Sequence, residues 1–111
     1  MTARLTAKLA VNALVRRANA VGDFATVAKK GDETAGQIIL VARRRDGSIQ
    51  VFTRTMNRQG GYAWTIATEA GQDELAKVNE YLERQSCYDP DLWIVELDTA
   101  NPERLVDDEL I

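Results

Sequence analysis

The sequence has no histidine and a single cysteine, Cys87, among its 111 residues. Without histidine the chain lacks the side chain that most often acts as a general base near neutral pH, and the usual transition-metal ligand. The Ser-His and Cys-His nucleophile pairs are excluded for the same reason. One cysteine can form neither an intrachain disulfide nor a thiolate metal cluster. We therefore expect no cofactor, no metal site and no catalytic residue, and the sequence favours a protein that is not an enzyme.

Long hydrophobic runs are missing as well. The longest, Ile38 to Ala42 and Leu92 to Val95, are far too short to span a bilayer, and the N-terminus lacks the pattern of a signal peptide. Hydrophobic residues make up 45% and charged residues 28%, which places the chain among globular proteins and not among disordered ones. We expect a cytoplasmic protein without a membrane partner. Residues 1–111 are expected to form one domain, with residues 99–111 as an acidic, frayed tail.

Two segments have the apolar spacing of helices. In Ala7 to Ala20, apolar side chains recur every three or four residues, and the hydroxyl of Thr6 is placed to cap the first turn. In Gln72 to Gln85, the stripe of Leu75, Val78 and Leu82 shows the same period. Each pattern predicts an amphipathic helix that covers one face of a sheet.

Four segments between these helices have the character of strands: Phe24 to Lys29, Gln37 to Arg44, Ile49 to Met56 and Tyr62 to Ala67. The Asp46-Gly47 pair predicts a tight hairpin between the second and the third. In the third strand, alternation sends Ile49, Val51 and Thr53 to one face and Gln50, Phe52 and Arg54 to the other, and we expect one of these two faces to meet water. In the fourth, Tyr62, Trp64 and Ile66 share a face that is expected to belong to the core.

The C-terminal segment Asp89 to Asp98 contains four consecutive apolar residues, Leu92 to Val95, and Leu97 follows after one glutamate. Such a run predicts a strand buried on both faces, in the middle of a sheet. Alternation directs Trp93, Val95 and Leu97 to one face and Leu92 and Ile94 to the other. The element order α-β-β-β-β-α-β predicts an α+β fold: an antiparallel β-meander of about four strands plus a central C-terminal strand, with two main helices packed on the sheet.

The charges are divided unevenly along the chain. Residues 1–60 carry 11 Lys or Arg against 4 Asp or Glu, and residues 61–111 carry 3 against 13. A basic half can bind phosphates, although two halves of one compact domain can also neutralise each other, which is the interpretation we favour. The residues of a candidate nucleic-acid surface are Arg16, Arg17, Arg43, Arg44, Arg45 and Arg54. Alternation already divides this set, because Arg43 and Arg45 point opposite to Arg44.

Carboxylates gather around the last strand. Asp89, Asp91, Glu96 and Asp98 offer oxygens suited to a hard cation such as Mg²⁺. On a strand, Asp91 and Glu96 point to opposite faces, whereas Glu96 and Asp98 share one. We favour a structural interpretation, in which Asp89 and Asp91 bind backbone N–H groups of a turn and Glu96 marks the end of the strand in solvent. A carboxylate-metal hydrolase that uses Glu96, Asp98 and Asp32 is the remaining alternative.

The loop Gly31 to Gly36 has a glycine at each end. Loops that cradle phosphates lead from a strand into a helix, whereas this one lies between two predicted strands. We expect the glycines to permit tight turns and Asp32 to cap the backbone of its own loop.

Several of these stretches resemble a small bacterial family, domain of unknown function 1491. The resemblance rests on Leu14-Val15-Arg16-Arg17, Gly22 to Val27, Lys30-Gly31-Asp32 with Ala35-Gly36, and above all Asp89-Pro90-Asp91-Leu92-Trp93-Ile94-Val95-Glu96. It covers nearly the whole chain and is weakest between Ser48 and Glu69. It implies a short, single-domain, cytoplasmic bacterial protein, and it brings no assigned activity, cofactor or catalytic residue.

Three functions follow as hypotheses. The leading one is a non-enzymatic binding or interaction module, which meets a protein partner or a second copy of itself through an exposed strand edge. The second is nucleic-acid binding through the six arginines named above. The third is the carboxylate-metal hydrolase.

Overall fold

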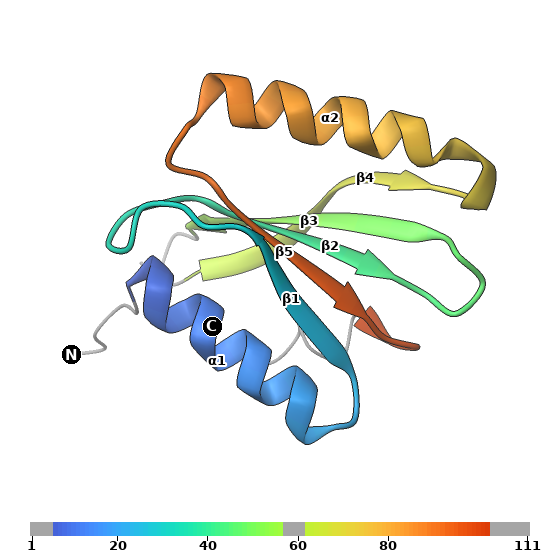
Figure 1. Ribbon diagram of the computed structural model, residues 1–111, viewed down its shortest axis with the longest axis horizontal. Helices are drawn as coiled ribbons and strands as arrows, with labels where there is room; N and C mark the ends of the chain where they lie inside the picture. Colours follow the sequence, from blue (N-terminus) through green and yellow to red (C-terminus); the bar gives the residue numbers. More distant parts are fainter. Residues whose placement is uncertain (1–5, 57–61, 103–111) are drawn as a thin grey trace.

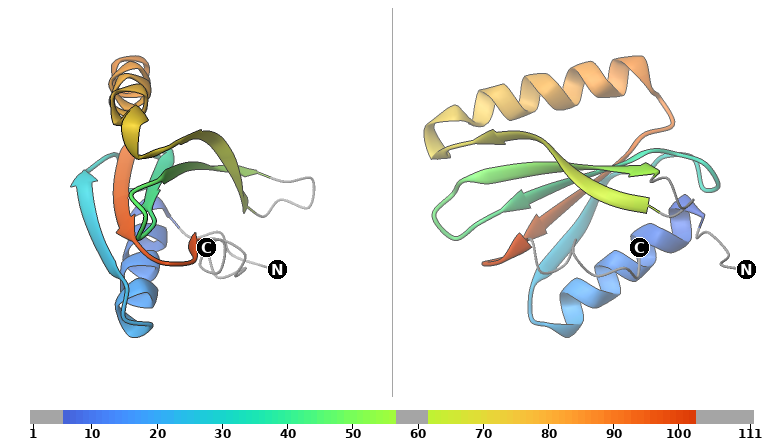
Figure 2. Two further views of the ribbon diagram at one scale, coloured as in Figure 1. Left: turned by 90° about the vertical axis from the view of Figure 1, so that its right-hand side faces the viewer. Right: turned by 180° about the vertical axis from the view of Figure 1, so that it is seen from behind.

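The computed structural model describes residues 6–56 and 62–102. In this part of the chain a five-stranded sheet lies between two helices, one on each face (Figures 1 and 2). The elements are α1 (Ala7–Ala20), β1 (Phe24–Lys29), β2 (Ile38–Arg43), β3 (Ile49–Met56), β4 (Tyr62–Ala70), a 3₁₀ turn (Gln72–Glu74), α2 (Leu75–Tyr88) and β5 (Trp93–Asp98). The predicted α+β class and element order are confirmed.

The strands follow the spatial order β1-β5-β2-β3-β4. The last strand, β5, runs antiparallel to β1 and parallel to β2, and the pairs β2–β3 and β3–β4 are antiparallel. The two-sided apolarity of β5 therefore predicted its central place correctly. Because β5 inserts between β1 and β2, the meander proper consists of β2, β3 and β4, and β1 becomes an edge strand.

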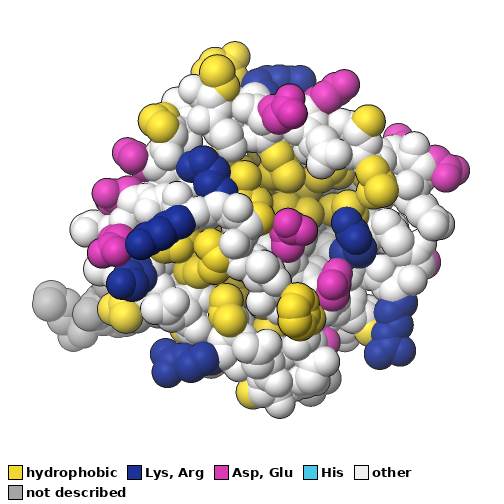
Figure 3. All heavy atoms as spheres, viewed as in Figure 1, with side chains coloured by type: hydrophobic (Ala, Val, Ile, Leu, Met, Phe, Trp, Pro, Cys, Tyr) yellow, Lys and Arg dark blue, Asp and Glu magenta, His cyan; other side chains and the backbone are white. Residues whose placement is uncertain are grey.

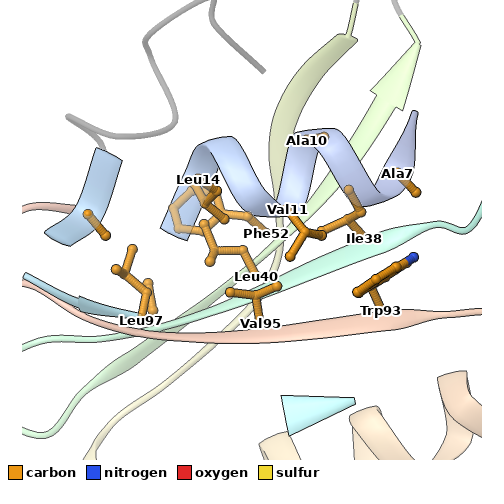
Figure 4. Close-up of a cluster of buried hydrophobic side chains, with 12 residues drawn as sticks. Ala7, Ala10, Val11, Leu14, Ile38, Leu40, Phe52, Trp93, Val95 and Leu97 are labelled. Atoms are coloured by element: carbon orange, nitrogen blue, oxygen red, sulfur yellow. The ribbon is translucent and has the colours of Figure 1, made fainter. Parts of the chain in front are cut away.

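The first core cluster lies between α1 and the sheet (Figure 4). Leu14 and Val11 of α1 pack towards Leu40 of β2 and Val95 of β5, and Trp93 lies at the end of the cluster near Ala7. Thr6 caps the helix as expected, since its Oγ1 accepts a hydrogen bond from the N–H of Leu9 at 3.4 Å.

The second core cluster lies between the sheet and α2. Leu92 and Ile94 belong to it, with Val78 of α2 fully buried against the sheet. The predicted division of β5 into two apolar faces is thus confirmed. The main contacts of α2 are with β3 and β4, so that no helix of the described ranges covers the β1 side of this face.

Two expectations about exposure are wrong. One face of β3 was expected to meet water, but both faces are largely buried, since Val51 is 0%, Phe52 3% and Arg54 5% exposed. The reason is that helices cover both faces of the sheet and β3 is an inner strand. On β4, Trp64 packs against the α1-side core, but Ile66 is 48% exposed because β4 is an edge strand. The side chain of Tyr62 lies outside the described part.

The hairpin between β2 and β3 forms at the predicted pair. Gly47 has a φ of 86°, a left-handed conformation that glycine adopts at little cost. The Asp46 carboxylate accepts hydrogen bonds from the Ser48 hydroxyl at 2.6 Å and from the Ser48 N–H at 2.9 Å. These bonds hold the pKa of Asp46 below its ordinary value of 3.8.

Beyond β5 the chain stays attached to the domain for a few residues. Thr99 donates its N–H to the carbonyl of Arg43 at 3.0 Å, and Pro102 is fully buried. Of the predicted acidic tail, residues 103–111 lie outside the described part. None of the helices in the described ranges is long and apolar enough to cross a membrane.

Candidate functional site

The six arginines predicted for a nucleic-acid surface are distributed over separate parts of the molecule. Arg16 and Arg17 lie on α1, the first exposed and the second half-buried. Arg54 lies on β3 and is buried among core residues. A phosphate backbone must reach its cationic groups at the surface, which only part of this set allows.

The other three arginines lie at the β2–β3 hairpin. Arg43 ends β2 and is exposed, and Arg45 is exposed in the turn. Arg44 donates from its guanidinium to Gln50 Oε1 at 2.8 Å. Figure 3 shows Lys and Arg side chains interspersed with Asp and Glu over the visible face. The structure does not gather the six arginines, and nucleic-acid binding stays a prediction.

The three carboxylates of the hydrolase alternative do not converge. Asp32 lies beside the beginning of β5, because its carbonyl accepts a hydrogen bond from Trp93 Nε1 at 2.6 Å. Glu96 and Asp98 lie further along the same strand, about 10 and 16 Å from Trp93 at the usual rise per residue. Ligands of one cation must lie within about 5 Å of each other. Among the described residues, no group of three His, Cys, Asp or Glu side chains is placed to hold a metal ion.

The segments Lys29–Gly36 and Asp89–Trp93 bind each other tightly, and we call this pair of segments the clasp. Lys29 donates its ammonium to two carbonyl oxygens, those of Pro90 at 2.9 Å and Leu92 at 2.8 Å. The N–H of Asp32 donates to the carbonyl of Asp91 at 2.9 Å. The Trp93 indole adds the bond to Asp32 described above. Side chains and backbone groups of the clasp are therefore engaged with one another.

Glycine is required in the clasp for reasons of space. A Cβ added to Gly31 or Gly36 would collide with the carbonyl oxygen of Asp91. Two local hydrogen-bonding patterns confirm what was expected of the Asp32 and Asp89 carboxylates, whereas Asp91 takes part through its backbone N–H and carbonyl. The Asp32 carboxylate accepts from the N–H groups of Thr34 (3.1 Å) and Ala35 (2.8 Å), and Asp89 Oδ1 accepts from the N–H of Asp91 at 3.1 Å.

The beginning of α1 is also bound to the clasp. The N–H groups of Ala7 and Lys8 donate to the carbonyls of Thr34 (3.1 Å) and Glu33 (2.9 Å). These groups would otherwise be unsatisfied at the helix terminus. The helix N-terminus is thus closed by the chain itself.

A second region has the opposite character, and we call it the β1-edge surface. It comprises the outer edge of β1 and the uncovered face beside it, where a pocket of about 170 Å³ opens. Two cross-strand rows line this pocket: Phe24, Asp98 and Arg43 form one, and Thr26, Glu96 and Val41 form the other. The rows exist because β5 brings β1 and β2 to its two sides.

The charged groups of this surface are not engaged. Arg43, Glu96 and Asp98 are exposed, and no hydrogen bond or ion pair joins their side chains to another residue in the described ranges. Glu96 and Asp98 share a face, as alternation predicted, and Glu96 is exposed as expected. The sequence pattern assigned Arg43 to a nucleic-acid surface, whereas the structure places it directly across from Asp98, with Glu96 two residues away on the same strand β5.

Apolar side chains add to the same surface. Phe24 is 64% and Val27 40% exposed, both on β1. Figure 3 looks onto the β1 side of the molecule and shows hydrophobic surface between α2 and the strands below it, bordered by charged groups. Sequence reasoning missed Phe24, because a phenylalanine at the start of a strand is usually a core residue, and only the position of β5 makes β1 an edge.

A broader hollow of about 410 Å³ lies near the opposite edge of the sheet, where the beginning of β3 meets the end of β4 and the 3₁₀ turn. Its polar groups are largely paired with each other. Arg44 donates to Gln50, Gln50 Nε2 lies 3.4 Å from Glu69 Oε1, and Glu74 Oε1 accepts from the N–H of Gly71 at 3.1 Å. This hollow offers a ligand fewer open groups than the β1-edge surface does.

Comparison with known proteins identifies the family. The family model described as "Protein of unknown function (DUF1491)" matches residues 5–107. The crystal structure of a DUF1491 family protein from Caulobacter crescentus CB15 is similar with a TM-score of 0.80 and 32% identity, covering 94% of this chain and 96% of that one. The solution structure of protein Atu0922 from A. tumefaciens has a TM-score of 0.74 at 32% identity, covering 94% and 93%. No curated protein matches. The clasp contains the residues on which the resemblance in sequence depends most, and the chain belongs to the DUF1491 family of proteins of unknown function.

Proposed function

We propose that the chain is a binding module that takes up an extended peptide segment along β1 by strand addition. One observation carries this proposal: β1 is an edge strand with exposed apolar side chains, and it lies directly beside a pocket with unengaged charged groups. Within the described ranges, β1 pairs with β5 alone. Its outer backbone groups are therefore available to an added strand.

In strand addition, the backbone edge of β1 and the pocket beside it have different roles. Backbone hydrogen bonds to the edge provide affinity, and pockets that accept alternate side chains provide specificity. The pocket of about 170 Å³ is smaller than the roughly 300–1,000 Å³ of sites for drug-sized ligands. Its size suits one side chain of a peptide better than a cofactor.

The charges of the pocket favour one kind of side chain. Two carboxylates, Glu96 and Asp98, face one guanidinium, Arg43, and Phe24 provides an apolar wall. A segment that presents a cationic or long apolar side chain matches this lining, because it meets both the excess negative charge and the exposed ring. The proposal retains the cytoplasmic location expected from the sequence.

Selection from a phage library of random peptides tests the proposal. We expect peptides with alternating apolar residues and at least one Lys or Arg, and their addition should shift the backbone amide NMR signals of β1 and β5. Phe24→Glu should weaken binding about tenfold or more, because it removes the apolar wall and adds a third negative charge.

The matched control is Leu9→Glu. Leu9 is 51% exposed and lies on α1, so this substitution also replaces an exposed apolar side chain by a carboxylate, but on a different surface. Selected peptides whose signals map to α1 or to the hollow beside Glu69, with β1 unchanged, would refute strand addition.

A further inference from the structure

We infer that the segment added to β1 is β1 of a second copy of this chain, in an antiparallel pair with the two-fold axis at Thr26. This inference rests on the proposed function and specifies its partner. A symmetric pair requires one patch to be complementary to itself. The residues Asp23 to Lys30 satisfy this requirement in three respects.

The first respect is charge. Asp23 precedes β1, and Lys29 and Lys30 lie at its other end. An antiparallel pair places the start of one strand opposite the end of the other. With the axis at Thr26, Asp23 of each copy lies opposite the Lys29–Lys30 end of the partner subunit, which forms two equivalent pairs of opposite charge.

The second respect is the facing of side chains. Residues directly opposite in an antiparallel pair point to the same face. The register with β5 shifts between Val27 and Lys29, so that Ala28 is the extra residue of a bulge and Lys29 lies opposite Ile94. Phe24, Thr26 and Lys29 therefore share the α2 side of the sheet. With the axis at Thr26, Ala25 of one copy lies opposite Val27 of the partner subunit. Because Ala28 is the extra residue of the bulge, Phe24 then lies opposite Lys29 of the partner subunit. In both pairs the two side chains point to the same face of the sheet.

The third respect is what the two lysines at the end of β1 already bind. Lysine on an edge strand usually guards it against pairing. Here Lys29 is turned towards its own clasp and binds the carbonyls of Pro90 and Leu92. Lys30 lies 3.6 Å from Glu33 in an ion pair whose two side chains are 66% and 56% exposed. An exposed pair of this kind is weak and yields readily to a new partner.

The opposite edge of the sheet lacks these properties. Strand β4 contains one charged residue, Glu69, and an exposed Ile66. Its self-pairing would bring no opposite charges together. The pair through β1 would also cover Phe24, which is 64% exposed, against 48% for Ile66 on β4.

A charge swap tests the register. Sedimentation equilibrium under reducing conditions compares the natural chain with Asp23→Lys, Lys30→Glu and the double variant. We expect a dimer whose dissociation constant rises about tenfold or more in each single variant, because like charges then face each other, and returns to within about threefold of the natural value in the double variant. Arg84→Glu, the same change on exposed α2, should leave the dissociation constant unchanged.

Disulfide trapping provides a second measurement. In a Cys87→Ser background, oxidation should link Thr26→Cys chains rapidly, since the axis brings the two copies of residue 26 together, whereas Ile66→Cys chains on β4 should stay unlinked. A dimer that is linked through residue 66, or single variants with unchanged affinity, would overturn the inference. A strict monomer whose β1 signals still respond to selected peptides refutes the second copy alone. A monomer with no peptide response at β1 refutes the proposed function as well.

Discussion

The clasp and the β1-edge surface lie on the same two strands, β1 and β5, and differ in how their polar groups are used. In the clasp, Lys29, Asp32 and Trp93 each bind a backbone group of the chain itself. At the other end of β5, Glu96 and Asp98 are exposed and unengaged by the described residues. One end of the strand pair maintains the fold, and the other leaves charge and apolar surface available for binding.

This difference bears on how the family pattern is interpreted. The Asp-Pro-Asp-Leu-Trp stretch is the most specific mark of the resemblance, and it lies in the clasp. Its roles there are structural. The carbonyl of Asp91 accepts a hydrogen bond from the N–H of Asp32 in the loop, and the Trp93 ring packs at the end of the core cluster near Ala7. A motif by which a family is recognised can thus maintain the fold, while the surface proposed for binding lies elsewhere.

The largest expected effect comes from filling space in the clasp. Gly36→Ala places a methyl group against the Asp91 and Asp32 carbonyls and the Trp93 ring. Because backbone on both sides must shift, we expect a loss of about 3 kcal/mol in the free energy of unfolding, measured by urea denaturation. Gly71→Ala is the matched control, since its Cβ would meet only Glu74 Oε1 at 3.6 Å, an ordinary contact. Equal losses in the two variants would mean that the clasp has no special packing.

A smaller loss is expected when the clasp loses one hydrogen bond and keeps most of its volume. Trp93→Phe removes the indole N–H, which donates to the Asp32 carbonyl at 2.6 Å, from a residue that is 4% exposed. We expect a cost of about 1–3 kcal/mol from the unsatisfied carbonyl and the lost ring volume. Amide hydrogen exchange of Asp32 should accelerate more than that of residues in β3. A uniform change across the sheet would instead indicate general loosening of the core.

The sequence predicted those features that depend on a residue and its neighbours along the chain. The alternation in β5 assigned Trp93 and Ile94 to opposite faces, and the Asp46-Gly47 pair located the hairpin, because both signals are local. The exposure of Phe24 and the burial of Arg54 depend on which strands are neighbours in space. Since β5 arrives last and separates β1 from β2, no local pattern showed that β1 would be an edge or that Phe24 and Arg43 would line one pocket.

The smallest expected effect comes from replacing one aspartate by alanine, once in the clasp and once at the β1-edge surface. Asp32→Ala removes a carboxylate that accepts two N–H groups of its loop, at 3.1 and 2.8 Å, and we expect a loss of about 1 kcal/mol in the free energy of unfolding. Asp98→Ala removes an exposed carboxylate that has no bond to a described side chain, and its effect should stay within about 0.5 kcal/mol. Urea denaturation of both variants measures the contrast. If Asp98→Ala lowered the free energy of unfolding as much as Asp32→Ala does, the C-terminal end of β5 would stabilise the fold as the clasp does. Its carboxylates would then not be free to bind a partner.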